Sequence, residues 1–150
     1  MLEPAPTTRI DPDLARGRLE EILPASAASP ALLVVSFPNT SYRLRLEPAG
    51  GVERFQACVG KRVLGRIHAR AKRVDVVGAG GRYVEPVHGR PRRVQGSVLG
   101  VSEKGNTITV GAGAPLVCAL TDPRQKAAMF EPGQFVSFDV ERGATFTLVE

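Results

Sequence analysis

The chain has 150 residues, enough for one domain with its own hydrophobic core. A hydrophobic fraction of 43% excludes an intrinsically disordered chain, and no apolar run reaches the roughly 20 residues of a membrane span. Sixteen Arg and four Lys against fifteen acidic residues give a net charge of +5, which favours anionic partners and gives no reason to expect a membrane partner.

The chain is expected to begin with a short helix. Asp11 is a suitable N-cap and Pro12 a suitable first helical residue, and a short apolar stripe follows. These signals predict a helix over 12–23 that ends before Pro24.

A β-hairpin is expected next. The continuous apolar run 31–37 predicts a strand buried on both faces, and the alternation of apolar and charged residues over 42–47 predicts a half-buried strand. Helix and hairpin together would form an N-terminal layer over 1–59.

From residue 60 onward the pattern predicts strands and turns with one short helix, so the chain as a whole is expected to be mostly β. The helix is expected over 124–130, with Asp122 as N-cap and Pro123 at its first position. The expected strands are 63–77, 83–87, 94–101, 107–110, 116–121, 135–140 and 145–149. No internal repeat or linker is evident, which predicts a single domain over 1–150 with a barrel over 60–150.

The segment 94–149 resembles an oligonucleotide/oligosaccharide-binding (OB) fold. Its expected order is three strands, a short helix and two strands, and Val94-Gln-Gly-Ser-Val98 is similar to the glycine-kinked first strand of such a barrel. The segment Phe130-Glu-Pro-Gly-Gln-Phe-Val136 resembles the helix-exit turn of the tRNA-anticodon-binding-like branch. The resemblance implies a small β-barrel with its ligand across 107–110 and 116–121. Those two strands hold no aromatic residue and no cation, so the usual stacking platform is missing.

The positive charge is concentrated in one segment. Between Gly60 and Arg93 there are ten cations and two acids, a net +8, which leaves −3 for the rest of the chain. Strand alternation places a row of them on one face, at intervals of about 7 Å. The row consists of Arg62, Arg66, His68, Arg70 and Lys72.

Like charges in a row repel one another unless an anion covers them, which favours a phosphate-rich partner. In the alternative interpretation the row is a solvated face neutralised by Glu47, Glu53 and Glu85.

A second basic cluster, Arg90-Pro-Arg-Arg93, is expected to be extended because of Pro91. It would serve either as a mobile arm that contacts phosphate or as a loop that keeps an edge strand soluble. Tyr83 is the best candidate for stacking on a base, with packing in a hairpin as the alternative.

Nothing in the sequence indicates catalysis, a metal site or a cofactor. His68 and His88 are the only histidines, and no ligand or nucleophile spacing surrounds them. Cys58 and Cys118 are far apart and lie among apolar residues, which predicts two reduced thiols and a cytoplasmic location.

The favoured hypothesis is therefore a non-enzymatic module that binds single-stranded DNA or RNA through backbone phosphates. The alternative is a protein interaction or assembly module that docks an acidic partner, and a third option is a barrel with an oligosaccharide or small-molecule pocket. The sequence leaves the oligomeric state open. The residues expected to contact nucleic acid are Arg62, Arg66, Arg70, Lys72, Tyr83, Arg90, Arg92 and Arg93.

Overall fold

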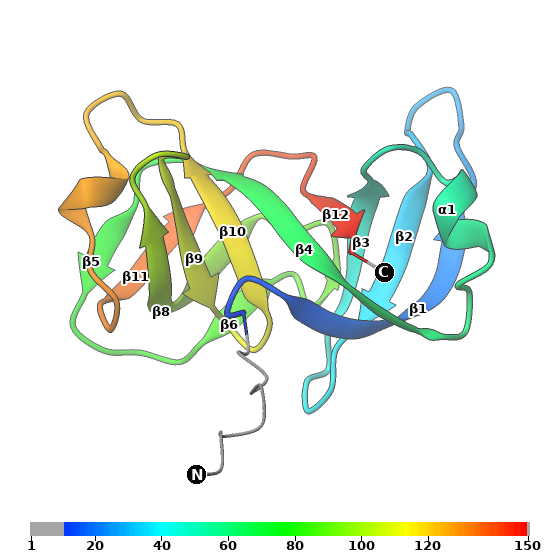
Figure 1. Ribbon diagram of the computed structural model, residues 1–150, viewed down its shortest axis with the longest axis horizontal. Coiled ribbons are helices and arrows are strands. Elements are labelled where there is room, and N and C mark those ends of the chain that lie inside the picture. Colours follow the sequence, from blue (N-terminus) through cyan, green and yellow to red (C-terminus); the bar gives the residue numbers. More distant parts are fainter. Residues whose placement is uncertain (1–10, 150) are drawn as a thin grey trace, which may run out of the picture.

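The computed structural model describes residues 11–149, and these are mostly β (Figure 1). The first ten residues of the expected N-terminal layer lie outside the described residues. Twelve strands, one helical turn (α1) and one 3-10 turn (η1) follow in chain order. They are β1 (Ala15–Leu23), β2 (Leu32–Ser36), β3 (Arg43–Pro48), α1 (Glu53–Gln56), β4 (Arg62–Ala71), β5 (Asp75–Val77), β6 (Tyr83–Glu85), β7 (His88–Gly89), β8 (Arg93–Ser102), β9 (Thr107–Gly111), β10 (Pro115–Leu120), η1 (Ala127–Met129), β11 (Phe135–Asp139) and β12 (Thr145–Leu148).

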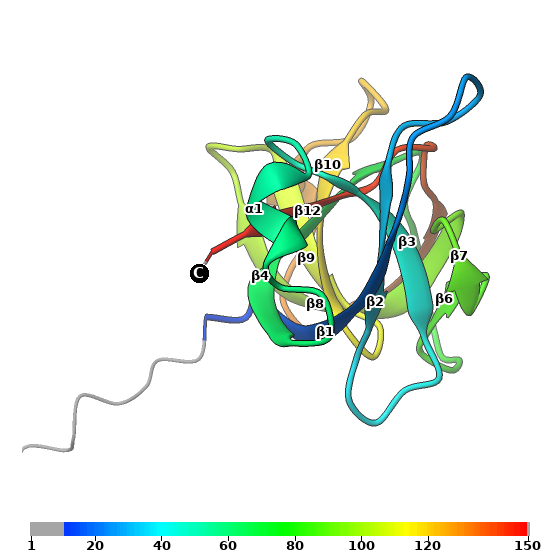
Figure 2. The same cartoon turned by 90° about the vertical axis from the view of Figure 1, so that its right-hand side faces the viewer.

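Five strands close into a small barrel. The order is β1–β2–β3–β12–β4, and β4 also pairs with β1, so the sheet returns to its first strand (Figure 2). The pairs are antiparallel except β3 with β12, which is parallel. A small, mostly β barrel is therefore confirmed, and α1 lies between its third and fourth strands, an arrangement compatible with an OB-like fold.

A second group of five strands has the same neighbour order: β8–β9–β10–β4–β11, with β11 also paired to β8. Its parallel pair is β10 with β4. The contact between β4 and β11 consists of a bridge from Ala71 to Val140, and Lys72 N–H donates to the Asp139 carbonyl at 2.8 Å. The turn η1 lies between β10 and β11, the counterparts of β3 and β4, and α1 lies between those two strands in the first barrel.

The two halves of the chain thus repeat one arrangement, although no repeat is evident in the sequence. Gly60 N–H donates to the Leu19 carbonyl at 2.7 Å, and Gly133 N–H donates to the Val98 carbonyl at 2.8 Å. Each half also lends a strand to the other, because β12 completes the first barrel while the end of β4 completes the second group. The repetition resides in strand pairing and turn geometry, which residue identities do not reveal.

The predicted helix over 12–23 is wrong, because this segment is strand β1. Ala15 and Leu19 are buried and the Arg residues between them are exposed, which is the period of two that a strand requires. Gly17 accounts for the close packing of β1 on β2, since a Cβ there would lie 2.7 Å from the Ser36 carbonyl oxygen. The expected helix and hairpin layer is therefore three strands of the closed barrel.

The predicted helix over 124–130 is reduced to η1. The Asp122 carboxylate accepts a hydrogen bond from Arg124 N–H at 2.9 Å, but no helix begins there, and the N-cap of η1 is Lys126. Lys126, however, is extended, with φ −130° and ψ 151°, so the turn after Asp122 does not continue into a helix.

Aromatic residues from both halves meet in the core. The rings of Phe55, in α1, and Phe146, in β12, lie with centroids 6.2 Å apart at a tilt of 59°, and Phe138 is almost fully buried. Tyr42 connects strand β6 to the core. Its hydroxyl donates to the Ala112 carbonyl at 2.7 Å and accepts from the N–H of Val84, in β6, at 2.9 Å. Within residues 11–149, none of the helices has the length and apolar character needed to cross a bilayer.

Candidate nucleic-acid interface

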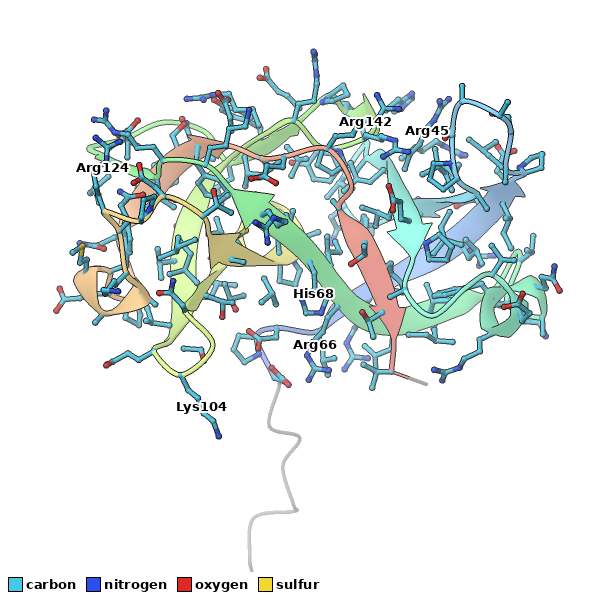
Figure 3. The ribbon with its side chains drawn as sticks, turned by 90° about the horizontal axis from the view of Figure 1, so that it is seen from above. Arg45, Arg66, His68, Lys104, Arg124 and Arg142 are labelled. Carbon is cyan, nitrogen blue, oxygen red and sulfur yellow. The ribbon has the colours of Figure 1, made fainter. Side chains whose placement is uncertain are left out.

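Strand β4 has the alternation that the sequence predicts. Val63, Ile67 and Ala69 are buried, whereas Arg62, His68, Arg70 and the following Lys72 are exposed. Arg66 and His68 project from the same face of the strand (Figure 3). The side chains of the predicted row therefore lie on the outward face of β4, with Arg66 half-buried and the others exposed.

Two members of the row are neutralised, but not by the three glutamates that the alternative interpretation names. Arg66 pairs with Asp11 at 2.9 Å, and Arg70 pairs with Glu141 at 3.0 Å. All four side chains are at least one-third exposed, so each pair stabilises the fold by no more than about 1 kcal/mol. Among residues 11–149, Arg62 and Lys72 form no ion pair.

The second cluster is not a mobile arm. Pro91 is buried, Arg92 N–H donates to the Glu85 carbonyl at 2.8 Å, and Val140 N–H donates to the Arg92 carbonyl at 2.9 Å. Arg90 is only 14% exposed and pairs with Glu47 at 3.0 Å. The backbone of this segment is therefore held against the end of β11.

Arg93 is anchored in the same way. It donates to Asp139 Oδ1 at 2.8 Å and to Ser137 Oγ at 2.7 Å. The hydrogen bond to the Asp139 carboxylate is the main cause that raises the pKa of the Arg93 guanidinium. Its position is thereby defined, and part of its charge is compensated.

Lys72, the last member of the row, and the second basic cluster line one open groove of about 530 Å³, the basic groove. It lies where the end of β4, the segment before β8 and the end of β11 come together. Five cations and two carboxylates line it, a net charge of +3. The lining residues are Lys72, Glu85, Arg90, Pro91, Arg92, Arg93, Asp139, Val140 and Arg142.

Three cations of the basic groove are exposed and form no ion pair within residues 11–149: Lys72, Arg92 and Arg142. Arg142 is absent from the sequence-based candidates because it lies in the turn between β11 and β12, about fifty residues beyond the basic segment (Figure 3). Only the pairing of β11 with β8 and its bridge to β4 place it there.

The remaining candidates lie elsewhere. Arg62, at the start of β4, borders a different groove. Tyr83 is half-buried, its hydroxyl donates to Gln95 Oε1 at 3.3 Å, and it does not line the basic groove. No aromatic residue lines this groove, so it can contact phosphates but offers no ring for base stacking.

Residues 11–149 contain no cluster of three or more His, Cys, Asp or Glu suited to a metal ion. Partial burial and the charge of Arg66 lower the pKa of His68, which favours its neutral form. Cys58 and Cys118 are free, and burial raises the pKa of the Cys118 thiol, which keeps it protonated.

No protein-family model, curated protein or solved structure matches this chain.

Proposed function

We propose that the protein is a non-enzymatic module that binds single-stranded DNA or RNA, with the backbone phosphates seated in the basic groove. The observation that carries the proposal is the convergence of Lys72, Arg92, Arg93 and Arg142, from three separate parts of the chain, on one open groove. Cations brought together in this way repel one another, and a polyanion relieves that repulsion.

A flexible single strand suits the geometry better than a duplex. The cations line a recess, and the elements around it provide no projecting helix that could enter a major groove. A single strand can fold its backbone into the recess. Because contacts to phosphate carry no sequence information, we expect little sequence preference.

The OB-like order of the strands supports this function, since OB barrels commonly bind oligonucleotides. Membership of the tRNA-anticodon-binding-like branch is the finer part of the proposal and depends on the segment 130–136. Gly133 of that segment, at φ +95°, makes the hydrogen bond to Val98 described above. The free thiols of Cys58 and Cys118 support a cytoplasmic location.

Fluorescence anisotropy with a labelled single strand tests the proposal. With about four phosphates neutralised, the logarithm of the affinity should fall with the logarithm of salt concentration with a slope of about −3. The triple variant Lys72→Gln, Arg92→Gln, Arg142→Gln should lose most of the affinity and flatten the slope. Lys104→Gln, in the exposed turn between β8 and β9, is the matched control and should bind like the wild type. Absence of binding at low salt, or binding indifferent to salt, would refute the proposal.

One observation favours an assembly function as a second candidate. Strand β5 ends the path of paired strands, and its Val76 is 56% exposed. An exposed apolar edge strand can pair with another chain. If this candidate is right, light scattering should show an oligomer whose size does not change when oligonucleotide is added, and the Val76→Lys variant should be monomeric. A monomeric wild type would exclude this candidate.

A further inference from the structure

A second groove lies beside β1 and the start of β4, and we call it the β1–β4 groove. It has a volume of about 560 Å³, and Arg16, Arg18 and Arg62 are the only charged residues that line it. The rest of the lining is Gly17, Ser36, Phe37, Pro38, Val63 and Leu64. It is therefore more one-sided in charge than the basic groove.

The three guanidinium groups are forced together by strand pairing. Arg18 and Arg62 are direct partners in the antiparallel pair of β1 with β4, so their side chains project from the same face. Arg16 lies two residues before Arg18 and therefore on that face as well. Like charges directly opposite each other destabilise a sheet.

No carboxylate compensates these three charges within residues 11–149. Arg18 donates from Nη1 to the Gly60 carbonyl, which is neutral. The Glu20 carboxylate accepts a hydrogen bond from the hydroxyl of Ser36, a residue of the lining, at 2.6 Å, and it forms no ion pair within residues 11–149. An anion in the β1–β4 groove would remove a repulsion that the fold itself leaves in place.

Strand β4 connects the two grooves. Arg62 is its first residue and Lys72 follows its last, so at about 3.3 Å per residue the grooves lie about 30 Å apart along the strand. Figure 1 shows β4 running diagonally from one half of the molecule to the other. Between the grooves the outward side chains include Arg66 and His68, both labelled in Figure 3, and then Arg70.

We propose that the β1–β4 groove binds a second stretch of the same single strand, which then runs along the solvent face of β4 between the grooves. The inference depends on the proposed function and extends its site. The ion pairs of Arg66 and Arg70 do not prevent it, because each guanidinium has five N–H donors and only one of them donates to a carboxylate. The ligand class is thus a single strand long enough to reach both grooves.

The test compares strands of about 4 and about 16 nucleotides, the limits of the usual site size of an OB barrel. The short strand cannot span β4, so two copies should bind per protein, each weakly. One long strand should bind per protein, at least tenfold more tightly, because its second contact is intramolecular.

The double variant Arg18→Gln, Arg62→Gln should bind one short strand and lose at least tenfold in affinity for the long strand. Arg16→Gln should also lower the affinity for the long strand. The Arg16 side chain makes no hydrogen bond within residues 11–149, so this variant should fold like the wild type and report on binding alone. Lys104→Gln again serves as the control, and circular dichroism checks that each variant is folded.

The inference is overturned if the long strand binds no more tightly than the short one, or if the β1–β4 groove variants leave its affinity unchanged. If the double variant Lys72→Gln, Arg92→Gln still weakens binding in that case, the proposed function holds and only binding in the β1–β4 groove is excluded. If neither strand binds at low salt, both proposals fail.

Discussion

The hydroxyl of Tyr42 provides a sharp test of how the candidate site is held, because it is the buried polar contact between the core and the segment that carries Arg90 to Arg93. In Tyr42→Phe, the Val84 N–H and the Ala112 carbonyl lose their shared partner. Val84 and Ala112 are fully buried, so water does not readily replace the hydroxyl. At about 1–3 kcal/mol for each of the two unsatisfied groups, the free energy of unfolding should fall by about 2–6 kcal/mol.

Urea denaturation measures this change, provided that the slope of the transition is the same in variant and wild type. Tyr83→Phe is the matched control, since it removes a hydroxyl whose 3.3 Å bond to Gln95 is only partly buried; its cost should be below about 1 kcal/mol. Equal losses in the two variants would refute the reasoning. Val84 lies in β6, and the last residue of that strand, Glu85, accepts the hydrogen bond from Arg92 N–H. Tyr42→Phe should therefore also weaken oligonucleotide binding.

Three further outcomes are expected. Gly17→Ala should destabilise by about 1–3 kcal/mol in thermal unfolding, because its Cβ would lie 2.7 Å from the Ser36 carbonyl oxygen, whereas Gly100→Ala, with nothing within 4 Å, should be close to neutral. The hydrogen bond from the Arg124 guanidinium lowers the pKa of Asp122 from 3.8 to about 2. The stability that the Asp122 charge provides is therefore present above pH 3.8 and lost as pH falls through 2. The free energy of unfolding of Asp122→Asn should depend less on pH in this range. Finally, the two pieces of the chain cut between β5 and β6 should fold only when mixed, as seen by circular dichroism, because each half completes the other's sheet; independent folding of either piece would contradict the strand exchange.

The local pattern of the sequence was sufficient for the outward row on β4, because apolar and charged residues alternate cleanly there. It failed over residues 12–23. There the capping signals of Asp11 and Pro12 predicted a helix, whereas the segment pairs with β2 and β4, and Gly17 packs closely on β2. Sequence pattern could not foresee that packing, which depends on a strand fifteen residues further along the chain.

By itself the sequence determined a mostly β chain, the absence of catalytic spacings and a concentration of positive charge before residue 94, since composition and strand period are local properties. Only the tertiary structure decided where that charge acts. It paired Arg66, Arg70 and Arg90 with acids from distant segments, brought Arg142 beside Lys72 and Arg92, and placed Arg18 opposite Arg62. Each of these outcomes depends on which strands become neighbours. The neighbours are set by the exchange of β4 and β12 between the two halves. This exchange pairs residues that are far apart in the chain, so no local stretch of sequence encodes it.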